Sequence, residues 1–187
     1  MKNINKFKNY EPASMAPPLN LFWKKAKDSY IWDNSNRKYI DFTSTIFVTN
    51  IGHGNKTFKK KIFNVLNSPL SHTDTYYNKY REEYVKKLIN FFGNKKLNKC
   101  FFLSSGSEAI EAAFKLTRLN GTKINKKKSG IISLKGNWHG RTMAAQMLSN
   151  DKSQSLWITS KDKNIYHIDF PYPWHKDFDK KSFFSNS

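Results

Sequence analysis

Between Phe101 and Lys115 an apolar run passes through small polar residues into a helical pattern, and this junction constrains the fold more than any other segment. Phe101–Leu103 favour a buried strand, and the residues after the turn have the composition of a helix. Ser105 and Glu108 fit the Ser-x-x-Glu capping box, which predicts that the helix begins beside Ser105. A strand that turns directly into a helix is the building unit of an α/β fold.

The turn at this junction is suited to bind a phosphate group. Gly106 lets the backbone approach an anion closely, and the amides of the first helical turn point toward it. Ser105 and Ser107 add hydroxyl donors at the same position. The alternative is a plain capped turn between strand and helix, because serine-rich turns before helices are common. A second motif is needed to decide between the two.

A second apolar run, Ile131–Leu134, leads into a short segment with an aromatic residue, a histidine and an arginine. Trp138 offers a flat aromatic face, and Arg141 offers a guanidinium that pairs with a carboxylate through two parallel hydrogen bonds. This combination suits a planar ring ligand together with a carboxylate. No second histidine, cysteine or carboxylate stands at metal-ligand spacing beside His139, so no metal site is predicted.

The two motifs together resemble the class III aminotransferases of the fold type I pyridoxal-phosphate superfamily. The strongest matches are Ser105–Ala109 with Glu111–Ala113, and Trp138–Thr142 further along the chain. The similarity extends to four other segments, namely Tyr30–Asp33, Tyr39–Phe42, Asn50–Gly54 and Pro171–Pro173. It covers the chain from Leu21 to Trp174.

The resemblance implies an α/β fold: the N-terminal part of a fold type I transferase, with an incomplete three-layer sheet domain preceded by an arm and a β-hairpin. Residues 1–20 are expected to form an extended arm, since they are polar and then proline-rich. Residues 21–70 are expected to hold the hairpin and a connecting helix region. Residues 71–187 are expected to be the first part of the large pyridoxal-phosphate-binding domain, in truncated form.

Periodicity predicts the elements before the junction. Ser29–Asp33 and Lys38–Phe42 alternate as a hairpin across residues 34–37. Two helices follow, each with an apolar face that we expect to pack into a core. The faces are Phe58, Ile62, Phe63, Val65 and Leu66 in the first helix, and Tyr80, Tyr84, Val85, Leu88, Ile89 and Phe92 in the second. Gly93 then ends the second helix, and from Lys99 strands and helices alternate.

The resemblance also assigns roles to individual residues. The residues expected to bind pyridoxal 5'-phosphate are Ser105, Gly106, Ser107, Trp138 and His139. Of these, Trp138 is expected to stack on the pyridine ring, and His139 to orient the cofactor as its neighbour. Arg141 is expected to bind a substrate carboxylate.

The implied reaction exchanges an amino group between an amino donor and a 2-oxo acid. The donor is expected to be an ω-amino acid such as 4-aminobutyrate or acetylornithine. Of these, 4-aminobutyrate is favoured by the segments His72–Asp74 and Pro171–Pro173. In the family, the lysine that bonds to the cofactor and the aspartate that holds its ring nitrogen follow later in the chain, beyond Ser187. No catalytic residue is therefore assigned, and this chain alone is expected to be inactive. The full-length enzyme is expected to be a homodimer.

Three explanations for the missing segment stay open. The chain is a truncated or frame-interrupted copy of a longer enzyme, the first half of a split enzyme, or a non-catalytic remnant. As a split half or a remnant, it is expected to associate with a partner chain through its unpaired sheet edge.

The net charge of +19 raises the question of nucleic acid, but the lysines are scattered over nearly every predicted helix and loop. Without a recognised binding motif, nucleic-acid binding is not expected. No apolar run reaches the length of a membrane span, and no signal peptide is recognisable, so a membrane partner is not expected either. The single Cys100 has no partner for an internal disulfide, and the cytoplasm is therefore the expected location.

Overall fold

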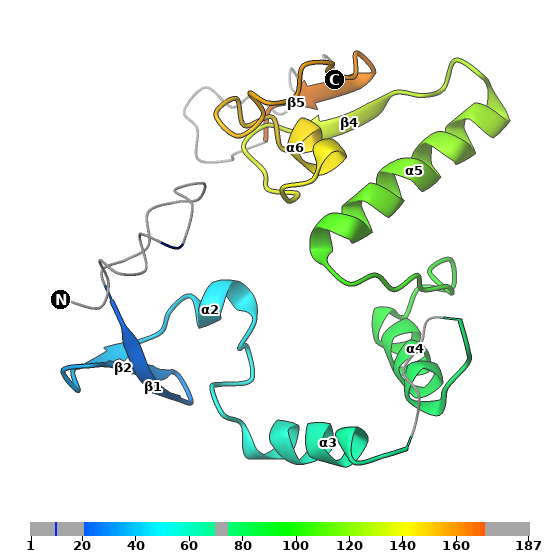
Figure 1. Cartoon of the computed structure of the whole chain (residues 1–187). Helices are drawn as coiled ribbons and strands as arrows, with labels where there is room; N and C mark the ends of the chain where they lie inside the picture. The colour runs from blue at the N-terminus through cyan, green and yellow to red at the C-terminus, as the bar shows by residue number, and fades with distance from the viewer. Residues whose placement is uncertain (1–9, 11–20, 70–74, 171–187) are drawn as a thin grey trace. The chain divides into compact units, whose positions relative to one another are not determined.

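The computed structural model describes residue 10, residues 21–69 and residues 75–170 (Figure 1). The chain divides into two compact units, Met1–Asn78 and Lys79–Ser187, and each is described here by itself. Several sequence predictions lie outside the described residues: the arm over residues 1–20, apart from residue 10, and the segments His72–Asp74 and Pro171–Pro173. The domain boundaries that the sequence suggested stay a prediction.

The first unit contains a three-stranded antiparallel sheet in the order β1-β2-β3. Its strands are β1 (Trp23–Lys27), β2 (Tyr30–Asp33) and β3 (Lys38–Ile40). β2 pairs with β3 across residues 34–37, which confirms the predicted hairpin. Ile31, at the centre of β2, is only 4% exposed. Asp33, two residues further on and thus on the same face of the strand, is 8% exposed.

Asp33 organises the hairpin turn through its carboxylate. Its Oδ1 accepts hydrogen bonds from the backbone amides of Ser35 at 2.8 Å and Arg37 at 2.9 Å. Its Oδ2 accepts another from the hydroxyl of Tyr39 at 2.9 Å. Because this carboxylate satisfies several donors at once, it fixes the register between the two strands.

After the sheet, the chain forms two helical segments. α2 (Ser44–Phe47) is a single left-handed turn, with φ between +47° and +65°. α3 (Lys56–Leu66) begins at Asn55, whose side-chain oxygen accepts a hydrogen bond from the Phe58 amide at 2.9 Å. This N-cap confirms the first helix that periodicity predicts.

The second unit contains the strand and helix alternation. Its elements are α4 (Lys79–Phe92), α5 (Gly106–Ile124), β4 (Ile131–Leu134), α6 (Met143–Ser149) and β5 (Ile165–Ile168). β4 and β5 pair in parallel, with Ile131 opposite Ile165 and Ser133 opposite His167. Parallel neighbours need a crossover, and here α6 lies between them in the sequence. The α/β prediction for this part of the chain is confirmed.

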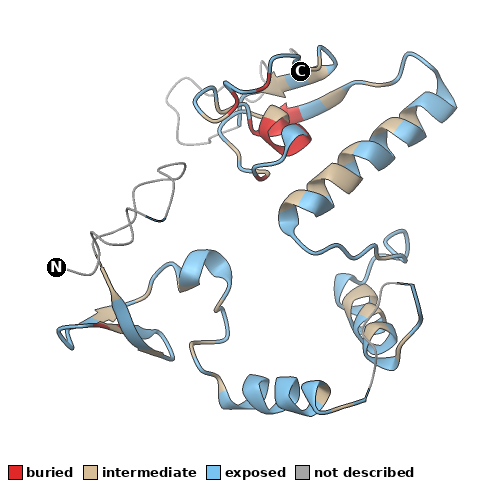
Figure 2. Ribbon diagram, in the orientation of Figure 1, coloured by how far each residue is buried: buried red, intermediate tan, exposed pale blue. Residues whose placement is uncertain are grey.

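The buried residues of the second unit gather around α6 (Figure 2). Ala145 is fully buried, Ala144 is 4% exposed, and Leu148 is 7% exposed. Ile158, in the following loop, is 4% exposed. This small core fixes α6 and the residues just before it, which carry one of the two predicted motifs.

Two expectations from the sequence are wrong for the described residues. Phe101–Leu103 form no strand, and the side chain of Phe101 is 72% exposed rather than buried. A strand exists only where another strand pairs with it, and within the described part of this unit β4 and β5 pair only with each other. Cys100, expected in the same buried strand, is half-buried.

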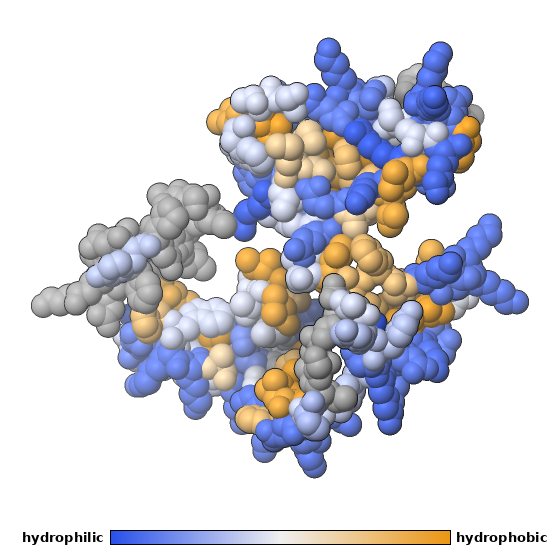
Figure 3. Space-filling model, turned by 45° about the vertical axis from the view of Figure 1, so that its right-hand side comes forward, coloured by the Kyte–Doolittle hydropathy of each residue, from blue (hydrophilic) through white to orange (hydrophobic). Residues whose placement is uncertain are grey.

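The apolar faces of α3 and α4 are the second wrong expectation, because neither helix has a buried residue. Leu66 in α3 is 70% exposed and Phe92 in α4 is 58% exposed. Among the described residues, neither helix contacts another helix or strand of its own unit. Apolar side chains of both helices therefore lie open, since an amphipathic face is buried only when another layer covers it. Figure 3 shows hydrophobic patches exposed among hydrophilic side chains on one face of the molecule.

Candidate functional site

The site begins at the first turn of α5. The Ser105 hydroxyl accepts a hydrogen bond from the Glu108 amide at 3.2 Å, which makes Ser105 the N-cap and confirms where the helix begins. A β-carbon placed on Gly106 would find no atom within 4 Å. The first turn of the helix is thus open at Gly106, and the amides there that Ser105 does not cap are available to an anion.

Gly140 brings the second motif onto this turn. A β-carbon at this position would lie 2.1 Å from the Ser107 Oγ and 3.1 Å from the Ser107 Cα. Gly140 is buried, and its φ of +128° lies in a region that favours glycine. Only a residue without a side chain allows this approach. The two motifs that the sequence analysis singled out therefore meet in the structure.

A hydrogen bond between α5 and α6 forms a second link. The Ala144 amide donates to the Glu111 Oε1 at 2.9 Å. Ala144 is in the first turn of α6, and Thr142, the N-cap residue, forms no side-chain capping bond. Glu111 was matched to the family by sequence but carried no predicted role. The sequence did contain one indication that Glu111 lies near the site: Ser107 and Glu111 are four residues apart and therefore share a helix face.

Trp138 and Arg141 lie close to each other. The Arg141 Cζ is 5.1 Å from the centroid of the Trp138 ring, within the range of a cation–π contact. Trp138 is 57% exposed. A flat aromatic surface and an exposed guanidinium therefore stand within two residues of Gly140, which touches the first turn of α5.

His139 holds this segment against β4 and α6. Its backbone amide donates to the Ser149 Oγ at 2.9 Å, and its Nε2 lies 3.3 Å from the Ser133 Oγ. Because the Ser133 hydroxyl donates to the Leu148 carbonyl at 2.8 Å, the imidazole is the donor toward Ser133. Burial, and secondarily the charge of the nearby His167, lower the pKa of His139. The neutral ring is thus engaged with protein, and its contact with a cofactor stays a prediction.

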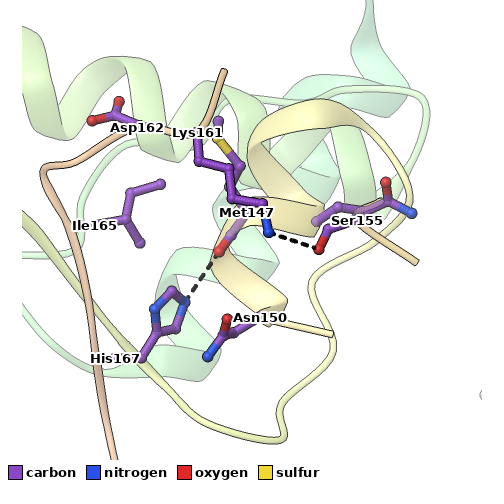
Figure 4. A pocket seen from close by; sticks show the side chains of 8 residues that line it. Met147, Asn150, Ser155, Lys161, Asp162, Ile165 and His167 are labelled. Atoms are coloured by element: carbon purple, nitrogen blue, oxygen red, sulfur yellow. Dashed lines mark hydrogen bonds between the residues drawn. The ribbon is translucent and has the colours of Figure 1, made fainter. Parts of the chain in front are cut away.

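A pocket of about 190 Å³ lies elsewhere in the second unit (Figure 4). Its lining residues are Gln146, Met147, Asn150, Ser155, Lys161, Asp162, Ile165 and His167. The Lys161 Nζ donates to the Ser155 Oγ at 3.4 Å, and the His167 Nε2 lies 3.1 Å from the Met147 carbonyl oxygen (Figure 4). None of the predicted site residues lines this pocket. The motifs instead meet on an open surface, and their chemistry makes that surface the better candidate.

Two further properties concern the described residues only. No group of three or more histidine, cysteine, aspartate or glutamate side chains there is arranged to hold a metal ion. No helix among them combines the length and the apolar character needed to cross a bilayer.

Comparison with known proteins identifies the family. The family model for class III aminotransferases matches residues 11–185. The chain therefore belongs to the class III aminotransferases, as its motifs suggested.

Curated relatives match most of the chain. It is 32% identical over 157 residues to the mitochondrial acetylornithine aminotransferase of Candida glabrata, covering 81% of this chain and 37% of the relative. It is 35% identical over 154 residues to the acetylornithine/succinyldiaminopimelate aminotransferase of Buchnera aphidicola subsp. Acyrthosiphon pisum, covering 82% and 37%. The chain thus spans little more than a third of the length of these relatives.

Solved structures show the same fold. An ornithine aminotransferase from Toxoplasma gondii matches with a TM-score of 0.78 at 18% identity, covering 91% of this chain and 40% of that one. An amine transaminase from an uncultivated Pseudomonas species, solved in its PLP-bound form, matches with a TM-score of 0.77 at 19% identity, covering 94% and 41%. The prediction of an incomplete fold type I transferase is confirmed.

Proposed function

We propose that this chain is the N-terminal part of a pyridoxal-phosphate-dependent aminotransferase that moves an amino group from an acetylornithine-type donor to a 2-oxo acid. One observation carries the proposal: the contact of Gly140 with Ser107. It brings an anion-binding turn, an exposed aromatic face and an arginine to one place, and these are the groups that a phosphorylated ring and a carboxylate substrate need.

The residues present fit the cofactor. Open space at Gly106 leaves room for a phosphate, and the Ser105 cap keeps the first-turn amides in place to donate to it. The exposed Trp138 ring offers a face on which a pyridine ring stacks. When bound, pyridoxal phosphate supplies an aldehyde carbon and a ring that accepts electrons from the substrate. The role of Ser105–Ser107 is to bind and orient that group.

Arg141 supports a donor that carries a carboxylate. Its guanidinium is exposed beside Trp138, so a carboxylate that approaches the ring meets two parallel donors. The names of the curated relatives favour acetylornithine or succinylornithine. We therefore place acetylornithine before 4-aminobutyrate, whose supporting segments lie outside the described residues.

The whole protein is proposed to be a homodimer located in the cytoplasm, with Cys100 as a free thiol. A second proposal is that another polypeptide supplies the remaining part of the fold. The open apolar faces of α3 and α4 support it, since Phe63 is 63% exposed and Phe92 is 58% exposed. Co-expression with the remaining part of a relative, followed by co-purification and gel filtration, separates the two proposals.

A chimaera tests the reaction. This chain replaces the matching part of the Buchnera relative, and transfer of an amino group to a 2-oxo acid is measured with acetylornithine and with 4-aminobutyrate as donors. We expect transfer with acetylornithine at the higher kcat/KM. Arg141→Gln should raise KM for the donor while pyridoxal-phosphate binding is kept, and Ser107→Ala should weaken that binding instead.

Two results would count against the proposal. A folded chimaera that binds pyridoxal phosphate but transfers from neither donor contradicts the reaction. Higher kcat/KM with 4-aminobutyrate contradicts the donor while leaving the reaction class intact. The unchanged relative, assayed in parallel, shows that the conditions support transfer.

A further inference from the structure

Glu111 connects the two halves of the candidate site. It follows Ser107 by one turn on α5, and its half-buried carboxylate accepts the Ala144 amide across 33 residues of sequence. A side-chain acceptor on the second residue of a helix is the arrangement that an N-cap residue normally provides. Here that acceptor comes from a different helix.

α6 depends on this acceptor because its own N-cap residue supplies none. Thr142 forms no side-chain capping bond, and a negative carboxylate near the first turn also favours the helix electrostatically. Most of α6 is buried in the core of the second unit. Glu111 therefore ties α5 to the most firmly packed helix of this unit.

The chain between Trp138 and Ala144 is short and is attached to α5 at two points. Gly140 is packed against Ser107, and Ala144 is bonded to Glu111. Arg141 lies between these two attachments, and Trp138 lies just before the first. If the second attachment is released, the segment keeps the Gly140 contact with α5 and the bonds of His139 to Ser149 and Ser133, but it loses its hydrogen bond to α5.

We propose that Glu111 is a positioning residue, which holds the Trp138–Thr142 segment in register with the phosphate-binding turn by capping α6. This inference rests on the proposed function, because the position of the Trp138–Thr142 segment relative to the first turn of α5 matters here for binding pyridoxal phosphate. In this role Glu111 acts through Ala144 and the residues before it, and not by binding the cofactor.

The test uses the full chain with three variants. Glu111→Ala removes the acceptor, and Glu111→Gln keeps an acceptor oxygen while removing the charge. Glu83→Ala is the matched control, because it also removes one carboxylate from a helix, where it forms an exposed ion pair with Lys79 at 3.8 Å. Hydrogen exchange of the Ala144 amide and the NMR signal of the Trp138 indole, assigned by its loss in Trp138→Phe, are recorded without any cofactor. Binding of pyridoxal phosphate is then measured by equilibrium dialysis.

We expect Ala144 exchange to become about tenfold faster in Glu111→Ala, within the range for loss of a helix cap. The Trp138 signal should shift in the same variant, and the Kd for pyridoxal phosphate should rise by about fivefold. Glu111→Gln should recover most of each effect, and Glu83→Ala should match the wild type. Recovery by glutamine separates positioning from a general loss of folding.

Unchanged exchange and an unchanged Trp138 signal in Glu111→Ala would overturn the proposal, whatever the cofactor affinity. If Glu111→Ala is too unstable to measure, Glu111→Gln provides the test. Slow exchange of the Ala144 amide in Glu111→Gln supports the proposal, because the retained side-chain oxygen still accepts that amide. Fast exchange of the same amide contradicts the proposal. If the exchange results appear as expected but no variant, including the wild type, binds pyridoxal phosphate, the capping contact stands and the proposed function fails. The two failures are thus distinguishable.

Discussion

Gly140 and Ser107 are in such close contact that a β-carbon on residue 140 would lie 2.1 Å from the Ser107 hydroxyl oxygen. This contact joins the segment that carries Trp138 and Arg141 to the first turn of α5. Each motif alone fits a common local structure, and together they carry the groups that the proposed site for a phosphorylated ring requires.

The first prediction concerns Gly140→Ala. The added methyl group would overlap Ser107, and alanine would also have to adopt a φ of +128°. We expect the free energy of unfolding to fall by about 3 kcal/mol, the sum of backbone strain and overpacking. Urea unfolding followed by circular dichroism measures it.

Gly136→Ala is the control for Gly140→Ala. Gly136 has a φ of +74°, but a β-carbon there would find no atom within 4 Å. It should cost about 1 kcal/mol, from backbone strain alone. An equal decrease in the free energy of unfolding in both variants would show that residue 140 and Ser107 are further apart than in the structure.

The second prediction separates the cap at Ser105 from the phosphate site. Ser105→Ala should lower the free energy of unfolding by about 1 kcal/mol, because the Glu108 amide loses its acceptor. Ser105→Asp should stay within a few tenths of a kcal/mol of the wild type, since aspartate caps helices well. Yet its negative charge beside a phosphate should weaken binding by about tenfold. Equilibrium dialysis with inorganic phosphate and with pyridoxal phosphate checks this, and undiminished binding in Ser105→Asp would place the phosphate elsewhere.

Local patterns were sufficient to predict much of the fold. The hairpin around Asp33 and the start of α5 at Ser105 both depend on residues that are near each other in the sequence. Each of them is present in the structure. Periodicity and capping residues determine such elements with little help from the rest of the chain.

Features that depend on distant partners were not predictable in the same way. Phe101–Leu103 have the composition of a strand but lack a pairing partner among the described residues. The capping of α6 by Glu111 joins positions 33 residues apart, which no local pattern indicates. The roles of Trp138 and Arg141 toward a ligand also stay predictions, because they depend on a bound group as well as on the chain.

The third prediction concerns pH and His139. Burial, with a smaller effect of His167, lowers the pKa of this imidazole in the folded chain. Below the unfolded pKa of about 6.5, the unfolded chain then binds more protons than the folded chain. Stability should therefore fall as pH drops from about 6.5 through the folded pKa of His139.

Unfolding of the wild type and of His139→Gln between about pH 7 and pH 5 measures this dependence. The slope should be smaller in His139→Gln, since glutamine does not titrate. His167→Gln should also reduce the slope, because it removes the second cause of the shift. Identical slopes in all three proteins would mean that His139 titrates normally in the folded chain.

The fourth prediction concerns Asp41 and His53 in the first unit. The His53 Nε2 lies 2.8 Å from the Asp41 Oδ2, and the Asp41 side chain is 4% exposed. The hydrogen bond from His53 lowers the pKa of Asp41, although burial opposes it, and hydrogen bonds from Thr43 add to the lowering. The ionised carboxylate therefore stabilises the fold at pH values above its unfolded pKa of about 3.9. This contribution is lost as pH falls through the folded pKa.

Asp41→Asn tests this contribution, because it keeps the shape of the side chain and removes the charge. We expect a lower urea midpoint than the wild type at about pH 7, and a difference that shrinks toward zero as pH falls to about 2. Asp169→Asn is the control: that carboxylate is 75% exposed and pairs with Lys135 at the surface, so its loss should change the midpoint little. A difference between Asp41→Asn and the wild type that stays constant over the whole pH range would show that the hydrogen-bonding pattern, and not the ionised carboxylate, stabilises this loop.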